Sequence, residues 1–276
     1  MQHLLYDIYN FLSQTAPPPP TYGAYHLGWI AATLVMCGLL VLLFSSCSEK
    51  TARAIVAILW VLILIFELGK QLLGSLTPVD GKIIFDYEWK FFLYQFCSTP
   101  LYVMPFVAFM KEGEKRNTAI IFLSTFSVIG GIVVLVAPHS VLGSNVFLSA
   151  QSMLHHGVQV AAGIYLSVRY RAILTLNRFF RASVLFVFLT YLAILLNVFF
   201  QKYFHIGGMD ESVNLFFVSP HTRYVPEILE GVGIESLPYP IFLLGYVLLF
   251  ILAAYLLMMC ESYFSRKAFY ESKKSL

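Results

Sequence analysis

Long apolar runs separated by short polar segments dominate the pattern of hydrophobic and polar positions along this chain. The runs lack the alternation of a half-exposed strand, and ~20 apolar residues in a helix cross a hydrocarbon core of ~30 Å. Backbone groups in lipid must be satisfied internally, so such runs are expected to be helices. The pattern therefore predicts an all-α, polytopic membrane bundle of seven transmembrane helices, at residues 24–45, 54–75, 89–110, 117–137, 147–168, 179–201 and 237–260.

Composition agrees with a membrane protein and argues against a nucleic-acid-binding one. Hydrophobic residues make up 59% of the 276 residues and charged residues 12%, about half the charged share of a soluble domain. The formal net charge of +3 is spread over the loops, with no basic stripe interleaved with aromatic residues. We expect membrane lipids as partners and no nucleic acid, and no obligate protein partner is indicated.

The same pattern divides the chain into three parts. In residues 1–23, Leu4, Ile8 and Phe11 stand at helical spacing, which predicts a short amphipathic helix at the membrane surface. The prolines at 17–20 form a stiff spacer after it. Residues 24–262 form the seven-helix transmembrane domain, and residues 263–276 form a basic tail.

The Lys and Arg residues predict the orientation in the membrane. Of the 18, thirteen fall on the side that holds the C-terminus and five on the side that holds the N-terminus. Cytoplasmic loops carry the excess of positive charge, so the N-terminus is expected outside and the C-terminus in the cytoplasm. We expect an integral, multi-pass membrane protein, located in the plasma membrane if the source is bacterial.

Polar side chains inside the predicted spans are candidates for function, because an ionisable group in hydrocarbon is costly unless it is paired or faces a cavity. They are Glu67, Lys70, Gln95, Cys97, Gln151, His155, His156, Gln159 and Asn197. Counted from the predicted span ends, Glu67, Cys97 and His155 each lie ~8 residues from the outer face, or ~12 Å at a rise of 1.5 Å per residue. Three helices thus bring a nucleophile, a base and a carboxylate to one level.

That level suits nucleophilic catalysis on a lipid. A Cys thiol is a good nucleophile once deprotonated, and a nearby His takes its proton. We assign Cys97 as the nucleophile and His155 as the base, with Glu67 or Gln151 as the group that orients the imidazole. An acyl-enzyme at this depth would lie where a phospholipid ester lies, just below the headgroups.

Each of these residues also has a purely structural interpretation. A single Cys in a transmembrane helix usually fills space. Glu67 and Lys70, three residues apart, can form a self-contained ion pair. Gln151, His155 and Gln159, four residues apart, can form a hydrogen-bonded seam between helices. The residues alone leave these alternatives open.

Other chemistries have little support. The chain has no His-Glu-x-x-His motif, no Cys/His cluster and no glycine-rich phosphate loop, so we expect neither a metal nor a cofactor. A receptor of the rhodopsin type also has seven helices and an outer N-terminus. However, the third span ends in Lys111 and Glu112 instead of Asp-Arg-Tyr, and the seventh has neither Asn-Pro-x-x-Tyr nor a lysine for retinal.

Three motifs together resemble a known family. They are FLYQFCST at residues 92–99, HHG at 155–157 and NLFFVSP at 214–220, the last followed by Pro238 and Pro240 at the start of the final span. In this order and spacing the chain resembles the YwaF-like family of bacterial integral membrane proteins, whose animal relatives are the transmembrane protein 164 acyltransferases. The resemblance covers most of the chain after the proline run. It departs from the family at Leu215 and Leu237, where the family has Tyr and Trp.

The resemblance implies a membrane acyltransferase or transacylase that moves a fatty acyl chain between phospholipids. In this interpretation Cys97 accepts the acyl chain and His155 or His156 assists, with His155 favoured by its depth. The expected substrate-binding residues are His156, Glu67, Lys70, Gln95, Gln151, Asn197 and Asn214. The alternatives are a non-enzymatic binder or transporter of a lipid or small amphiphile, and a lipid ester hydrolase that uses the same site.

Overall fold

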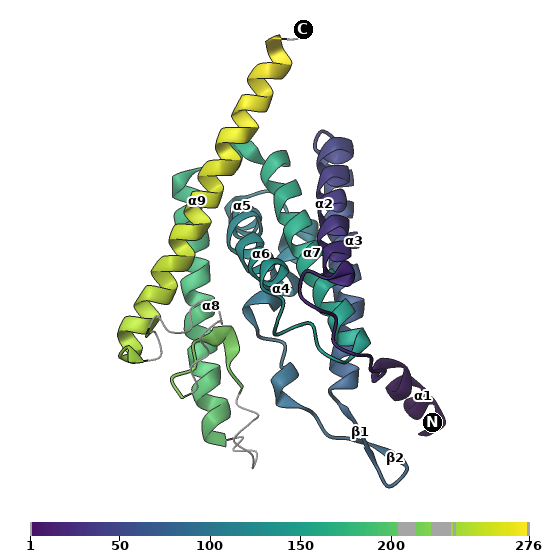
Figure 1. The fold of residues 1–276 in the computed structure, drawn as a ribbon. Helices are drawn as coiled ribbons and strands as arrows, with labels where there is room; N and C mark the ends of the chain where they lie inside the picture. Colours follow the sequence, from purple (N-terminus) through teal and green to yellow (C-terminus); the bar gives the residue numbers. More distant parts are fainter. Residues whose placement is uncertain (1, 204–212, 222–232, 234–235, 275–276) are drawn as a thin grey trace.

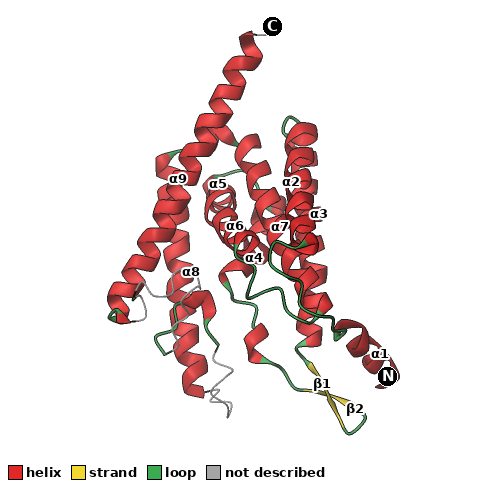
Figure 2. Cartoon of the chain, in the orientation of Figure 1, coloured by secondary structure: helices red, strands yellow, loops and turns green. Residues whose placement is uncertain are grey.

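The computed structural model describes residues 2–203, 213–221, 233 and 236–274, and only the backbone of residues 264–274. Within these residues the chain forms a helical bundle with one small β-hairpin (Figures 1 and 2). The helices are α1 (Gln2–Leu12), α2 (Ala24–Phe44), α3 (Glu49–Leu73), α4 (Thr99–Phe109), α5 (Glu114–Phe122), α6 (Val128–Val136), α7 (Val146–Arg169), α8 (Leu176–Tyr203) and α9 (Tyr239–Lys274). A π-helical segment, η3 (Leu123–Ser127), joins α5 to α6 in one continuous helix.

Five helical stretches among the described residues are long and apolar enough to cross a membrane. They are α2, α3, Glu114–Val136, α8 and Tyr239–Tyr263. The prediction of an all-α, multi-pass membrane protein is therefore confirmed. Helices α4 and α7 occupy the other two predicted segments, but α4 has only 11 residues and α7 carries many polar side chains. The count of seven crossings and the orientation stay predictions.

Helix α7 lies at the centre of the bundle. It packs against α2, α3 and α6, and Figure 1 shows it between α2 and α3 on one side and α5 and α6 on the other. Its neighbours cover Gln151, His155, His156 and Gln159, all of which are buried. A helix that is covered by other helices needs no continuous apolar surface toward lipid. This position explains why the bundle concentrates its polar side chains on α7.

The prediction of a continuous third helix over residues 89–110 is wrong. Residues 89–98 instead contain two 3-10 turns, η1 (Trp89–Phe91) and η2 (Phe96–Ser98), and helix α4 begins only at Thr99. Proline at position 100 accounts for this start, because proline lacks an N–H and fits the first turn of a helix. Cys97 therefore lies in a short turn at the start of α4 instead of inside a long helix.

A β-hairpin follows α3, although no strand is predicted there from the sequence. Its strands β1 (Leu76–Val79) and β2 (Lys82–Phe85) pair antiparallel, with Val79 opposite Lys82. The two turn residues, Asp80 and Gly81, have φ values of 47° and 73°. Such a two-residue hairpin turn needs left-handed backbone angles, and Asp-Gly is a preferred pair for it. The dipeptide was the local signal that could have revealed the hairpin.

The first and the last described segments of the chain are both helical. Helix α1 forms where a helix is expected at the N-terminus, and its Gln2 side chain exchanges two hydrogen bonds with the backbone of Ile83 in β2. Helix α9 continues for 36 residues to Lys274, so the predicted basic tail begins as a continuation of the last helix. The N-terminus and the C-terminus lie at opposite ends of the bundle (Figure 1).

Candidate active site

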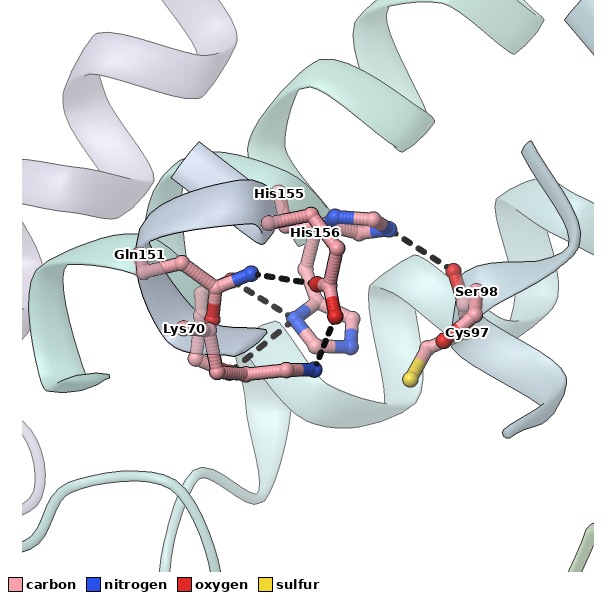
Figure 3. A pocket seen from close by; sticks show the side chains of 8 residues that line it. Lys70, Cys97, Ser98, Gln151, His155 and His156 are labelled. Atoms are coloured by element: carbon pink, nitrogen blue, oxygen red, sulfur yellow. Dashed lines mark hydrogen bonds and ion pairs between the residues drawn. The ribbon is translucent and has the colours of Figure 1, made fainter. Parts of the chain in front are cut away.

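A small cavity lies between α3, η2 and α7. Seven of its eight lining residues are polar and the eighth is a cysteine, in a chain that is 59% hydrophobic. Figure 3 draws these side chains. They are Glu67 and Lys70 from α3, Cys97 and Ser98 from η2, and Gln151, Ser152, His155 and His156 from α7.

The spacing of residues along α7 accounts for its four contributions. Positions i and i+4 lie on the same face of a helix. Gln151 and His155 therefore form one row, and Ser152 and His156 form the row beside it. The side chain of Asn145 fixes where the helix begins, since its Oδ1 accepts a backbone N–H of the first turn at 2.8 Å.

The carboxylate of Glu67 is the centre of the polar network beside the cavity. It is 2% exposed, and its oxygens accept hydrogen bonds from Lys70 Nζ at 2.7 Å, Gln71 Nε2 at 2.8 Å and Gln151 Nε2 at 3.0 Å. The predicted pair of Glu67 and Lys70 is thus present. Three donors compensate the buried negative charge, and Figure 3 shows the Lys70 ammonium on the side of the cavity that faces Cys97.

Gln71 holds this network in place and was missed from the sequence. Its Nε2 also donates to the carbonyl oxygen of Phe91 at 2.7 Å, and its Oε1 accepts from the hydroxyl of Tyr87 at 2.6 Å. Burial, with a contribution from the charge of Glu67, raises the pKa of Tyr87 to about 12, so this hydroxyl remains a donor at neutral pH. The spacing of four residues between Glu67 and Gln71 could have indicated the contact.

The hydrogen bonds of the two histidines define their tautomers. His156 Nδ1 lies 2.7 Å from the carbonyl oxygen of Ser152, and His155 Nε2 lies 2.8 Å from the carbonyl oxygen of Cys97. A carbonyl only accepts, so each of these ring nitrogens carries the proton and the other nitrogen keeps a lone pair. Those other nitrogens, His156 Nε2 and His155 Nδ1, are buried and have no hydrogen-bond partner among the described residues.

The backbone of Cys97 and its thiol point in different directions. The carbonyl of Cys97 faces the His155 ring, whereas Figure 3 shows the sulfur pointing into the cavity, toward the side that holds the His156 ring and the Lys70 ammonium. The expected proximity of Cys97 and His155 is therefore present, but their hydrogen bond uses the carbonyl of Cys97. The lone pair of His156 lies on the side toward which the thiol points.

Six of the nine residues expected from the sequence line the cavity, and three do not. Gln95, Asn197 and Asn214 are absent from the lining. Asn197 instead holds the backbone of Leu215 through two hydrogen bonds, and Asn214 Oδ1 accepts from the backbone N–H of Ser219. Depth in the membrane could not separate Gln95 and Asn197 from the cavity group, because it does not say which way a side chain points. Asn214 was expected only from the family motif.

Two lining residues were not expected from the sequence. Ser98 and Ser152 adjoin predicted site residues, but serine is common in membrane helices and carries no charge that would single it out. Within the described residues no group of three or more His, Cys, Asp or Glu side chains is arranged to hold a metal ion. The arrangement offers a thiol, two imidazoles that each have one ring nitrogen without a partner among the described residues, and an ammonium on the side toward which the thiol points.

The comparison with protein families gives a match over most of the chain. The model of the TMEM164 family matches residues 21–258, which include every residue that lines the cavity. The searches of curated proteins and of solved structures found no match.

Proposed function

Because the chain belongs to the TMEM164 family, and its motifs resemble those of the acyltransferases among the transmembrane protein 164 relatives, we propose that it transfers fatty acyl chains between phospholipids through a thioester on Cys97. The observation that carries this proposal is the polar cavity, in which the thiol points toward an imidazole with a free lone pair and toward the ammonium of Lys70. Nothing of this kind is needed to pack helices together.

The reaction proceeds in two balanced steps. In the first, an imidazole takes the thiol proton and the sulfur attacks the ester carbonyl carbon of a phospholipid. The bond from that carbon to the glycerol oxygen breaks, the imidazolium returns the proton to this oxygen, and a lysophospholipid leaves. In the second, the hydroxyl of another lysophospholipid gives its proton to the imidazole and attacks the thioester. The bond from carbon to sulfur breaks, and the imidazolium returns the proton to the sulfur, which restores the thiol.

One of the two adjacent histidines serves as the base. In the conformation of the structure the hydrogen bonds favour His156, since its Nδ1–H is fixed by Ser152 and its Nε2 is free. His155, the residue favoured by depth, has to release the carbonyl of Cys97 before its Nε2 reaches the thiol. In this scheme His155 otherwise fixes the backbone of the nucleophile.

Lys70 and Glu67 complete the proposed site. An ammonium beside the thiol stabilises the thiolate and the oxyanion that forms during attack. Glu67 keeps that ammonium in place through the ion pair at 2.7 Å. The other residues expected to bind substrate support the site in this proposal by packing and by holding neighbouring groups in position. They are Gln151 and, outside the cavity lining, Gln95, Asn197 and Asn214.

The test is acyl transfer by the purified full-length protein in liposomes that contain a phospholipid with a labelled acyl chain and a lysophospholipid acceptor. The intact protein is expected to gain the mass of one acyl group, and Cys97→Ala is expected to lose the adduct and at least ~10³-fold of the transfer rate. Cys260→Ala, which removes an exposed thiol that does not line the cavity, is the matched control and should retain transfer.

Replacement of each histidine separates their roles. The base is the one whose change to Ala lowers transfer by ~10² to 10⁴-fold. Release of free fatty acid without transfer would make the protein a hydrolase with the same site. A folded Cys97→Ala protein that transfers acyl chains at the normal rate would refute the proposal, and would leave lipid binding or transport as the function.

A further inference from the structure

The 3-10 turn η5 (Leu215–Phe217) contains an unusual backbone conformation. Two consecutive residues that are not glycine, Phe216 and Phe217, have φ values of 56° and 58°. Side chains with a Cβ rarely adopt this left-handed region, and residues held there against their preference concentrate at functional sites. The surrounding structure has to supply the free energy that keeps the turn in this conformation.

Contacts from two helices hold the turn in place. Asn197 of α8 accepts from the backbone N–H of Leu215 at 2.8 Å and donates to its carbonyl oxygen at 3.0 Å. Asn197 is buried, so these bonds are formed away from water. Tyr239 at the start of α9 donates its hydroxyl to the carbonyl oxygen of Val218 at 2.9 Å. The turn is thus fixed on both sides, which allows it to persist despite its strain.

The ring that the turn presents to the bundle contacts the segment before the proposed nucleophile. Phe216 is fully buried, and its ring centroid lies 5.4 Å from that of Tyr94, nearly parallel, and 5.4 Å from that of Phe96, nearly perpendicular. Phe96 directly precedes Cys97 in η2. Phe217 in the same turn is instead 43% exposed. Among the described residues, Phe216 is therefore the one of the two whose ring packs on the residues just before Cys97.

The segment that Phe216 contacts is the one whose apolar pattern predicts a helix. Residues 89–98 are apolar enough to continue α4 toward its N-terminus, and they do not. Tyr94 is held by its hydroxyl, which donates to the carbonyl oxygen of Leu189 in α8, and Phe96 packs on Phe250 of α9. A helical continuation would turn each residue by about 100° relative to the next and would pull both rings from these positions.

We propose that Phe216 is a positioning residue for Cys97: its buried ring packs on Tyr94 and Phe96 and keeps the non-helical segment in the conformation that points the thiol into the cavity. The proposal rests on the proposed function for the meaning of that thiol. It also gives Asn197 a role, since this residue does not line the cavity but fixes the turn that carries Phe216.

The experiment measures alkylation of each cysteine by iodoacetamide in the full-length protein in lipid, read by peptide mass spectrometry. Phe216→Ala is expected to lower the alkylation rate of Cys97 by about tenfold or more, because the thiol no longer points toward the His156 imidazole and the Lys70 ammonium, which favour formation of the thiolate. His156→Ala should lower the rate in the native chain but have no further effect in Phe216→Ala. Phe217→Ala is the matched control and should leave the rate unchanged.

Cys37, which is buried in α2, reports unfolding in the same molecules. If Phe216→Ala also exposes Cys37, the same alkylation rates are measured in Phe216→Leu, and the same expected and contrary outcomes apply. Leu restores apolar volume without a ring. An unchanged rate at Cys97 in a folded variant, or an equal change in Phe217→Ala, would overturn the proposal. The measurement does not depend on acyl transfer, so a protein without transferase activity but with this alkylation pattern would refute the proposed function alone.

Discussion

His155 and His156 are neighbours in the chain, yet their rings meet different backbone carbonyls. The His155 ring contacts the carbonyl of Cys97 in η2, and the His156 ring contacts that of Ser152 one turn earlier in α7. Consecutive positions on a helix point about 100° apart, so the His155 ring meets the backbone of Cys97 while the His156 ring lies on the side toward which the thiol points. At the scale of single residues, two adjacent histidines can therefore make two different contacts at once, which one histidine could not.

Removal of the Glu67 charge is expected to destabilise the protein. Glu67→Gln leaves the Lys70 ammonium without its partner and places an amide NH₂ where three donors converge. Breaking one partner of a buried ion pair costs about 3 kcal/mol of the free energy of unfolding. The measurement is unfolding in mixed micelles as a function of the fraction of denaturing detergent.

A double variant provides the control for this prediction. In Glu67→Gln with Lys70→Met no ammonium is left unpaired, so more than half of the lost stability should return. If the double variant is as unstable as Glu67→Gln alone, the ion pair does not stabilise this part of the bundle. The hydrogen bonds from Gln71 and Gln151 to Glu67 would then be the stabilising contacts.

At the scale of elements, hydropathy located helices well and backbone irregularities poorly. Helices α2, α3 and α8 lie close to their predicted spans because an apolar run of this length has few alternatives in lipid. The same pattern predicted a helix over residues 89–98, where partners supplied by other elements, such as Phe216 and Gln71, stabilise turns instead. Those partners lie far away in the sequence, so no local pattern could reveal them.

In the candidate site too, a contact within one helix was predictable from the sequence and contacts between elements were not. The spacing of Glu67 and Lys70 predicted their ion pair, since both lie on one helix. One interpretation of the i,i+4 row of Gln151, His155 and Gln159 was a hydrogen-bonded seam between helices. Its members do form hydrogen bonds to other elements, but each to a different one: α3, η2 and η3. Which elements surround a helix is a property of the fold, and a single sequence contains it only indirectly.

Close packing of α7 on η3 depends on Gly163. A Cβ at this position would lie 2.5 Å from the carbonyl oxygen of Leu123 and would also meet the Val128 side chain. Because one of these neighbours is backbone, it cannot rotate away, and Gly163→Ala is expected to lower the free energy of unfolding by about 1–3 kcal/mol. Gly38→Ala in α2 is the matched control, since nothing lies within 4 Å of a Cβ there.

The two glycine variants are compared by the same detergent unfolding assay. Gly38→Ala should keep or slightly raise the stability, because Ala favours a helix more than Gly does. An unaffected Gly163→Ala protein would mean that α7 shifts easily against η3. The positions of the cavity residues on α7 would then also be less fixed than the close approach at Gly163 implies.

At the scale of the whole molecule, the end of the bundle that holds the C-terminus carries a cluster of arginines around Glu49. Its carboxylate oxygens lie 2.6 Å from Arg116, 3.2 Å from Arg53 and 3.5 Å from Arg169. Arg53 also donates to the carbonyl of Met110 at the end of α4, and Arg169 to that of Ser45 at the end of α2. The arginines thus meet the negative ends of helices, and they make this end of the bundle the basic one.

The basic end should face the cytoplasm, and the β-hairpin and cavity should face outward. Two exposed lysines at opposite ends test this with the same change: Lys82→Cys in β2 and Lys111→Cys in the turn after α4. In sealed spheroplasts a membrane-impermeant maleimide is expected to label Lys82→Cys, and to label Lys111→Cys only after permeabilisation.

The reverse pattern would invert the orientation and place the proposed acyl transfer in the cytoplasmic leaflet. Labelling of both residues from one side would mean that the bundle does not carry the chain across the membrane between these ends. Only the expected pattern places the thiol of Cys97 within reach of outer-leaflet esters, so this measurement also decides which pool of phospholipid should be offered in the transfer assay.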